Sequence, residues 1–521
     1  MTEFLTTGFD SPLLWALLAG QIAMGGFDII VHHELTERLA WRHSASKELQ
    51  LHAWRNLFYA VLFTAFAWLQ PHGLIAAAVF IILIVEIIIT LWDFVEEDRT
   101  RKLPATERVL HTLLAINYGA ILALVLPALV NWAALPTDLT VVNYGWGSAI
   151  LTMAGVGCVL FAVRDFFTSA RAARFTSPPA LNLEGPAMAA CHARRQILVT
   201  GGTGFVGRRL VDALVTAGHD VTVLTRDPGK AGGLTAPVRL VTDLAALNAD
   251  TRIDAIVDLA GEPLADGLWT DAKRQEILQS RMAIGSAIND LCARLTRAPE
   301  VLVTASAVGV YGLQAGDATL TEAEPGPGDD SFCARVCRAR EACAAGAQAN
   351  GVRTVALRIG LVLDRDDGLL GRLVPAFDLG LGGPIGSGEQ WMSWITRDDL
   401  VRLIAFVIAK PGIAGPVNAV APEPVRQRTF ARQLARQLHR PAVVPLPARP
   451  LALLGGAFAQ ELLLGGQRVV PAKALAAGFT FQAPTIDEGL RNALRLGAKP
   501  ERPAGDAGAA RELTPARAAL R

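Results

Sequence analysis

Three closely spaced glycines, Gly201, Gly204 and Gly207, follow a short apolar run at 197–200. The run is typical of a buried strand, and the segment after Gly207 has the apolar spacing of a helix. In such a turn Gly201 permits the bend, Gly204 lets the backbone approach phosphates, and Gly207 lets the helix pack close to the strand. Because the N-terminus of such a helix binds a pyrophosphate, the pattern predicts a dinucleotide-binding domain.

The residues after the next predicted strand, at 221–225, indicate which dinucleotide binds. A protein selective for NAD usually has Asp or Glu at the end of this strand, whereas this chain has Thr225 and Arg226. A guanidinium group there is suited to the oxygens of a 2′-phosphate. The sequence therefore predicts NADP(H) as the cofactor, and a solvated loop arginine without a ligand is the alternative.

Further strand candidates recur between helical segments at 238–241, 255–259, 301–305 and 354–357. This alternation is typical of an α/β domain with a doubly wound parallel sheet of the Rossmann type. Ligands of such sheets bind beyond the carboxyl ends of the strands. The candidate cofactor-binding residues lie in the glycine turn and at the strand ends: Gly201, Thr203, Gly204, Phe205, Val206, Gly207, Arg226, Asp243, Leu244, Ala260, Gly261 and Arg358.

The N-terminal part of the chain is strongly apolar. Overall, 51% of the 521 residues are hydrophobic, and the mean hydropathy is +0.34. The first apolar segment lacks a basic start and a cleavage site, so we expect a retained helix and not a signal peptide. Residues 1–167 are therefore predicted to form an all-α transmembrane domain with five spans of about 20 residues each. These spans are 12–31, 54–70, 74–94, 109–131 and 145–163.

The positions of Lys and Arg predict the orientation of these spans. Basic residues gather at 38–55, 99–108 and 164–174, and the alternate segments contain none. Since basic loops stay in the cytoplasm, the N-terminus is expected outside and the nucleotide domain inside. The chain is thus predicted to be a multi-pass protein of a bacterial inner membrane.

The rest of the chain divides by composition. A linker is expected at 168–194, an NADP(H)-binding domain at 195–423, a small C-terminal domain at 424–498, and a disordered tail at 499–521. The six cysteines form no CxxC pair, so we expect neither a disulfide nor a zinc ribbon. A net charge of +1 without a basic patch argues against a nucleic-acid partner.

Several motifs in the C-terminal part occur together in one known family. They include TGGTGFVG at 200–207, VDLAGEPLADGLWT at 257–270, SAVGVYG at 306–312, LRIGLVL at 357–363 and LGLGGPIGSGEQWMSWI at 379–395. With GGQRVVPAKALAAGF at 465–479, they resemble the extended short-chain dehydrogenase/reductase superfamily. The similarity is to its atypical, epimerase-like branch, whose members end in a small domain of unknown function. The resemblance implies an NADP(H)-type fold.

The resemblance also exposes a departure in the catalytic residues. Ordinary members use a Tyr-x-x-x-Lys pair, in which the Tyr hydroxyl moves a proton and the Lys lowers its pKa. The matching positions here are Cys333 and Cys337 in one register and Phe332 and Val336 in the other, and neither restores the pair. The usual Ser position falls on Ala307, next to Ser306. Tyr311 and Ser306 are therefore the candidate catalytic residues. The alternative for Tyr311 is a ring packed beside the sheet with its hydroxyl group bonded to the backbone.

Polar residues cluster near the cytoplasmic ends of the first four predicted spans. Asp28 and His32 are four residues apart, as are Glu107 and His111. Carboxylates and imidazoles that face each other in a helical bundle are typical of metal sites, and a charge inside an apolar span is costly. The alternatives are interfacial charges that fix the topology, and a lipid or quinone pocket. The candidate metal ligands are His33, His52, Glu86, Asp93, Glu97 and His111.

The leading functional hypothesis is a membrane-anchored NADP(H)-dependent oxidoreductase or epimerase that acts on a small-molecule or lipid-like substrate. One alternative is a sensor or scaffold that binds NADP(H) without turnover. Another is a metal-dependent membrane oxidase or hydroxylase that the soluble half serves. If the halves exchange substrate or electrons, we expect the 95–108 loop to face 380–395; a passive anchor is the alternative. The sequence predicts no oligomeric state.

Overall fold

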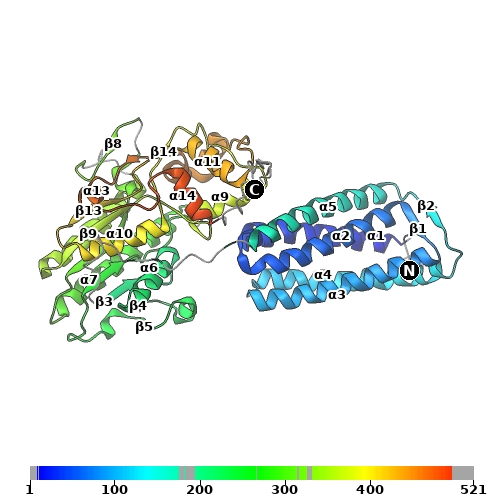
Figure 1. Ribbon diagram of the computed structural model, residues 1–521, viewed down its shortest axis with the longest axis horizontal. Helices are drawn as coiled ribbons and strands as arrows, with labels where there is room; N and C mark the ends of the chain where they lie inside the picture. The colour runs from blue at the N-terminus through cyan, green and yellow to red at the C-terminus, as the bar shows by residue number, and fades with distance from the viewer. Residues whose placement is uncertain are drawn as a thin grey trace, which may run out of the picture.

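The computed structural model describes residues 11–101, 103–173, 194–265, 267–313, 316–324 and 331–495, together with Phe9, Phe175, Leu181 and Leu183. An elongated helical domain lies beside an α/β unit (Figure 1). The predicted tail at 499–521 and most of the predicted linker lie outside the described residues. The last helix of the bundle continues to Ala172, past residue 167.

The helical domain consists of long helices that lie lengthwise beside one another (Figure 1). At the end distant from the α/β unit, β1 (Leu69–Pro71) pairs antiparallel with β2 (Leu139–Val141). Two 3₁₀ turns, Leu39–Trp41 and His43–Ala45, lie at the other end. The long helices are α1 (Pro12–Phe27), its π-helical continuation η2 (Asp28–Thr36), α2 (Ser46–Trp68), α3 (Leu74–Thr100), α4 (Ala105–Ala133) and α5 (Trp146–Ala172).

Four helical segments are long and apolar enough to cross a membrane: Pro12–Trp41, Leu74–Thr100, Ala105–Ala133 and Trp146–Ala172. They match four of the five predicted spans. The remaining predicted span, 54–70, lies mostly in α2, which is not among these candidates and carries Lys47, Glu48 and Arg55 in its first half. The number of spans therefore stays a prediction.

The α/β unit contains a seven-stranded sheet in the order β13-β9-β7-β6-β3-β4-β5, and every pair of neighbouring strands is parallel. The prediction of a Rossmann-type parallel sheet is confirmed. The strands are β3 (Gln196–Thr200), β4 (Asp220–Leu224), β5 (Val238–Val241), β6 (Ala255–Asp258), β7 (Val301–Ala307), β9 (Arg353–Ile359) and β13 (Gly415–Ala419). Strand β13, at one edge, was not predicted.

Helices cover both faces of the sheet because alternate strand residues point to opposite sides. Val199 packs into the core with α6 (Phe205–Thr216) and α10 (Arg397–Ala409). Its neighbour Leu198 packs into the opposite core with α7 (Asp271–Arg294). Helix α8 (Phe332–Ala345) lies beside α7. Short 3₁₀ turns lie in the connecting loops: Pro228–Gly233 (η6), Leu244–Ala246 (η7), Val308–Tyr311 (η8) and Gly346–Asn350 (η9).

The C-terminal residues and an insertion after β9 form a smaller domain. Its helices are α9 (Gly368–Asp378), α11 (Gln427–Leu438), α12 (Ala448–Ala459), the π-helical turn η10 (Gln460–Leu464), α13 (Ala472–Ala476) and α14 (Ile486–Leu494). Paired short strands complete it: β10 (Leu361–Leu363) with β12 (Trp394–Thr396), β11 (Trp391–Met392) with β14 (Val425–Arg426), and β8 (Thr319–Leu320) with β15 (Arg468–Val469).

The helical domain packs directly against this smaller domain. Trp41 and Ala172 share one apolar cluster with Leu370, Val374 and Phe377 of α9. No hydrogen bond or ion pair joins the described residues of 95–108 to 380–395. The docking surface on the helical domain is therefore formed by the 3₁₀ turns and the end of α5.

Candidate functional site: cofactor cleft and a polar cluster in the helical domain

The glycine turn has the geometry that phosphate binding needs. Gly201 has a φ of +69°, and its carbonyl oxygen accepts a hydrogen bond from the Gly204 N–H (3.0 Å). A Cβ atom on Gly207 would lie 2.1 Å from that same carbonyl oxygen. Gly204 is the N-cap of α6. The backbone N–H groups of Phe205 and Val206, and Thr203 before them, are therefore presented at a helix N-terminus.

A buried polar network holds the turn against the end of β6. Asp258 accepts hydrogen bonds from Thr200 Oγ1 (2.7 Å), Thr304 Oγ1 (3.2 Å) and Arg340 Nη2 (2.9 Å). Arg340 Nη1 also donates to the carbonyl oxygen of Ala260 (2.7 Å), directly before Gly261. These bonds fix the backbone at two neighbouring strand ends, so the cleft is preorganised.

The predicted NADP(H) determinant lies on the surface. Arg226 follows β4 and is exposed, and within the described part of the chain its side chain makes no hydrogen bond or ion pair. Asp243, after β5, accepts a hydrogen bond from Ala245 N–H (2.8 Å) and caps the 3₁₀ turn that begins at the buried Leu244. Arg226 is therefore available to a ligand, whereas Asp243 shapes its own loop.

A chain of hydrogen bonds links the candidate catalytic residues. Ser306 Oγ donates to Glu341 Oε1 (2.7 Å), and Arg358 Nε and Nη2 donate to the two Glu341 oxygens (3.0 Å each). Arg358 Nη1 donates to Tyr311 Oη (3.0 Å), which is 2.8 Å from Asn418 Oδ1 and 3.0 Å from the Thr321 carbonyl oxygen.

This network determines what Tyr311 and Ser306 can do. Tyr311 is fully buried, and burial raises the pKa of its phenol despite the neighbouring Arg358. That arrangement matches the alternative in which the ring packs beside the sheet, so a catalytic role for Tyr311 stays a prediction without geometric support. Ser306 is nearly buried at the end of β7 and is held by Glu341, and its role also stays a prediction.

The cysteines at the usual Tyr and Lys positions are neutral thiols. Burial, together with the Glu461 carboxylate, raises the pKa of Cys333 far above its usual range, and burial likewise raises that of Cys337. Glu461 also accepts hydrogen bonds from the N–H groups of Phe332 (3.0 Å) and Cys333 (2.9 Å) at the start of α8. A thiol of raised pKa replaces neither a phenol nor an ammonium group.

One cation of the cleft was not among the predicted site residues. Arg281 Nη1 donates to the carbonyl oxygens of Glu262 and Ile277 (2.9 Å each), and Arg281 has no carboxylate partner among the described residues. Burial and the nearby charge of Arg340 lower the pKa of Arg281 to about 10. In the sequence, Ser280 and Arg281 form one of the motifs that carry the family resemblance.

A second polar assembly lies inside the helical domain, at the end nearest the α/β unit. Two groups of side chains have potential ligand atoms within 4.8 Å of one another: Asp28, His33, Glu107 and His111, and His33, His52 and Glu97. Four of the predicted metal candidates are thus brought together. Asp28 and Glu107 join them, although the sequence did not place these two among the preferred ligands.

Asp93 and Glu86, the remaining two metal candidates, are bonded to other side chains. Asp93 Oδ2 is 3.0 Å from His52 Nε2 but is bonded to Arg55 (2.5 Å). Glu86 accepts hydrogen bonds from Thr90 Oγ1 (2.7 Å) and Tyr118 Oη (2.5 Å), and it belongs to neither group among the described residues. Glu86 is therefore a satisfied buried acid.

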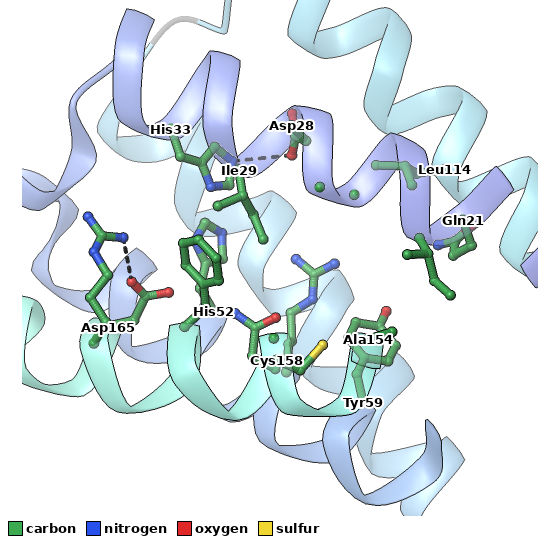
Figure 2. A pocket seen from close by; sticks show the side chains of 18 of the residues that line it. Gln21, Asp28, Ile29, His33, His52, Tyr59, Leu114, Ala154, Cys158 and Asp165 are labelled. Atoms are coloured by element: carbon green, nitrogen blue, oxygen red, sulfur yellow. Dashed lines mark hydrogen bonds and ion pairs between the residues drawn. The ribbon is translucent and has the colours of Figure 1, made fainter. Parts of the chain in front are cut away.

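A cavity of about 290 Å³ adjoins this assembly. Figure 2 shows His33 and His52 one above the other at one side of it, with Asp28 nearby. Apolar side chains line much of the remaining wall, among them Ile22, Phe63, Leu114 and Phe161. The cavity can therefore hold a small, mainly apolar molecule beside the imidazoles.

Comparisons with known proteins concern the α/β unit and the smaller domain. The NAD dependent epimerase/dehydratase family matches residues 197–419, and a domain of unknown function (DUF1731) matches residues 446–493. The chain is 36% identical over 315 residues to the chloroplastic epimerase family protein SDR39U1 homolog of Arabidopsis thaliana, which covers 58% of this chain and 89% of the relative. The chain is 35% identical over 302 residues to the Bos taurus epimerase family protein SDR39U1, and the match covers 57% of this chain and 99% of the relative.

A solved structure agrees with these matches. The crystal structure of human epimerase family protein SDR39U1 (isoform 2) with NADPH superimposes with a TM-score of 0.53 at 32% identity, and covers 57% of this chain and 99% of that one. The predicted resemblance to an epimerase-like family with a C-terminal domain of unknown function is confirmed. The chain belongs to the NAD dependent epimerase/dehydratase family, among the epimerase family proteins that include SDR39U1.

Proposed function

We propose that the chain is an NADP(H)-dependent oxidoreductase or epimerase, anchored in a membrane by its N-terminal helices, that acts on a small-molecule or lipid-like substrate. The observation that carries the cofactor choice is the exposed guanidinium of Arg226 at the end of β4. The glycine turn supports the binding of a dinucleotide, and the human relative is crystallised with NADPH.

Binding measurements test the cofactor. The full chain in detergent should bind NADPH at least about tenfold more tightly than NADH, because a paired 2′-phosphate contributes about 1.4 kcal/mol or more. Arg226→Ala should remove this preference and leave NADH binding unchanged. Arg239→Ala, which removes an exposed arginine of β5, is the matched control. Equal affinities for NADH and NADPH in the unaltered chain would contradict the proposal.

The bound nicotinamide would donate or accept a hydride, and a proton must then be transferred to or from the substrate oxygen. Ser306 is a hydroxyl group at the strand ends that a carboxylate orients, through Glu341 and its partner Arg358. We infer that Ser306 Oγ, whose own proton is donated to Glu341, accepts a hydrogen bond from the substrate hydroxyl group that is oxidised, and that the proton of this hydroxyl passes to solvent. This assignment needs no Tyr-x-x-x-Lys pair.

The thiols at the Tyr and Lys positions favour a second candidate function, a sensor that binds NADP(H) without turnover. NADPH deuterated at the transferable C4 position distinguishes the two when the full chain is incubated with a lipid extract. Deuterium in a lipid product supports the enzyme. Stoichiometric binding of NADPH without transferred label in any product supports the sensor over the oxidoreductase, since an epimerase would return the hydride to its own substrate.

The membrane anchor is supported by the outer surface of the bundle. Large apolar side chains face outward along α3 and α5; Ile81 is 60% exposed and Leu160 66%. Such a continuous apolar surface is unfavourable in water and is satisfied by lipid. The basic loops all lie at the end of the bundle nearest the α/β unit, so that unit is expected in the cytoplasm.

Two experiments test the anchor and its orientation. The full chain should stay in the membrane fraction after carbonate extraction. A reporter fused after Arg521 should be active only on the cytoplasmic side. Release by carbonate would contradict the anchor, and a reporter active only outside would contradict the orientation.

A further inference from the structure

Three buried side-chain atoms of one group of potential metal ligands have no hydrogen-bond partner. They are His33 Nε2, His52 Nε2 and Glu97 Oε1, from η2, α2 and α3, and their residues are only 8%, 6% and 1% exposed. Leaving such atoms unpaired away from water costs free energy. Each of the three residues has a ligand atom within 4.8 Å of a ligand atom of the other two.

The local geometry brings together atoms that carry lone pairs. The rings of His33 and His52 are stacked, with centroids 4.7 Å apart. His52 Nε2 is 3.0 Å from Asp93 Oδ2 and 3.8 Å from Glu97 Oε1, and His33 Nε2 is 3.3 Å from Asp28 Oδ2, but none of these contacts has hydrogen-bond geometry. Ligand atoms of one ion at about 2.1 Å lie about 3.0–3.4 Å apart. Because the two rings are parallel, the lone pairs of their nitrogens lie in parallel planes, so one ring must rotate out of the stack before both nitrogens can bind one cation.

The charges around His33, His52 and Glu97 also favour a bound cation. Eight buried carboxylates lie at this end of the bundle: Asp28, Glu34, Glu48, Asp93, Glu96, Glu97, Glu107 and Asp165. Four basic side chains pair with seven of them: Arg55 with Asp93, Arg101 with Glu48, Glu107 and, at 3.8 Å, Glu97, Arg164 with Glu34 and Asp165, and Lys47 with Glu96. Among the described residues, Asp28 has no arginine or lysine partner, and its ion pairs are with histidines. Either several protonated imidazoles or a metal ion must balance this excess.

We propose that His33, His52 and Glu97 bind a divalent first-row transition metal ion, with Fe²⁺ as the expected occupant. Two imidazoles and one carboxylate with open positions are the ligand set of non-haem Fe²⁺ sites. His111 Nδ1 lies 3.4 Å from the other Glu97 oxygen, so it orients that carboxylate from behind. The adjoining cavity gives a small molecule access to the open positions. The site is independent of the NADP(H) proposal.

The π-helical form of η2 supports this assignment. In a π-helix the backbone bonds join residues five apart, and such turns occur often at functional sites. Within η2, Asp28 and His33 are five residues apart and approach to 3.3 Å, which places His33 toward α2. A regular α-helix would pair Asp28 with His32 only.

Metal analysis of the full chain tests the proposal. Protein purified without chelator and reconstituted anaerobically with Fe²⁺ should hold about one ion per chain. Co²⁺ in its place should give visible ligand-field bands. Glu97→Gln and His33→Gln should each lose the ion. The matched controls are Glu86→Gln, another buried acid of α3, and His72→Gln, at the far end of the bundle; both should keep it.

Two results of this metal analysis would overturn the proposal. Less than about a tenth of an ion per chain after separate reconstitution with Fe²⁺, Mn²⁺, Co²⁺ and Zn²⁺ overturns the proposal and leaves a hydrogen-bonded imidazolium network. Equal metal content in the Glu97→Gln and His33→Gln variants also overturns it. If these variants fail to fold, the metal content and the Co²⁺ bands of the unaltered chain alone decide. Far-UV circular dichroism and thermal unfolding in detergent serve as the check that each variant is folded.

Discussion

Arg171, near the end of α5, forms a two-pronged ion pair with Asp378, the last residue of α9, with Nη1–Oδ1 and Nη2–Oδ2 distances of 2.9 and 2.7 Å. The Arg171 guanidinium also lies 4.1 Å from the ring centroid of Trp41. Helix α9 begins at Gly368, where an added Cβ atom would lie 3.2 Å from the ring of Phe205 in the cofactor turn. One helix therefore contacts both the helical domain and the cofactor turn.

Removing this ion pair should loosen the docking of the two halves. Arg171→Ala leaves the buried Asp378 with Arg440 alone, at a cost of about 1–2 kcal/mol. Hydrogen exchange measured by mass spectrometry should become about tenfold faster in α9 and in residues 38–45. Arg194→Ala breaks an equally two-pronged but exposed pair with Asp220, and should change neither region. Unchanged exchange in Arg171→Ala would show that apolar packing alone holds the halves together.

Replacing a glycine of the turn should affect both the packing of the α/β unit and the binding of NADPH. Gly207→Ala places a methyl group 2.1 Å from the Gly201 carbonyl oxygen, and backbone must shift to relieve it. We expect a stability loss of about 1–3 kcal/mol and at least a tenfold weaker NADPH affinity, by about 1.4 kcal/mol. Gly232→Ala, where nothing lies within 4 Å, is the control. A folded Gly207→Ala variant with full NADPH affinity would exclude phosphate binding at this turn.

Tyr311→Phe separates a structural from a catalytic role. The variant leaves buried Asn418 Oδ1 and one Arg358 donor without the hydroxyl group, so unfolding should become easier by about 1–3 kcal/mol. We expect NADPH binding and any cofactor-dependent turnover to stay within about twofold of the unaltered chain. A loss of turnover by about a hundredfold or more, with stability retained, would instead restore Tyr311 as the proton donor.

The parallel sheet could be predicted because its central strands are short apolar runs buried on both faces, as in β6. Strand β13 escaped prediction because Gly415, Pro416 and Asn418 weaken its strand signal, and Pro is tolerated only at a sheet edge. The glycine turn and the strand ends around the cleft could also be predicted, since their backbone conformation depends on residues that are adjacent in the sequence.

The polar cluster was only partly predictable, because spacing along one helix fixes a face but not what that face meets. Glu86, Asp93 and Glu97 share a face of α3, yet Tyr118 from α4 satisfies Glu86 while Glu97 turns toward His52. The π-helical register of η2 also carries no sequence signal that we recognise. The convergence of three helices on one point therefore required the tertiary structure.

His219 should make the stability of the chain depend on pH. It is buried, and its Nδ1 accepts a hydrogen bond from the Arg195 N–H (3.3 Å), which requires a neutral ring. Burial and the charge of Arg195 lower the pKa of His219 below its ordinary value of 6.5. The unfolded chain therefore takes up this proton first as the pH falls. The contribution of His219 to stability is complete above about pH 6.5 and declines below it, down to the lowered pKa of the folded state.

His219→Asn keeps an acceptor near the position of Nδ1 but does not titrate. In thermal unfolding scans of the full chain from pH 8 to pH 5, the unaltered chain should lose more stability on acidification than this variant. Parallel curves over that range would show that the ring is not held neutral.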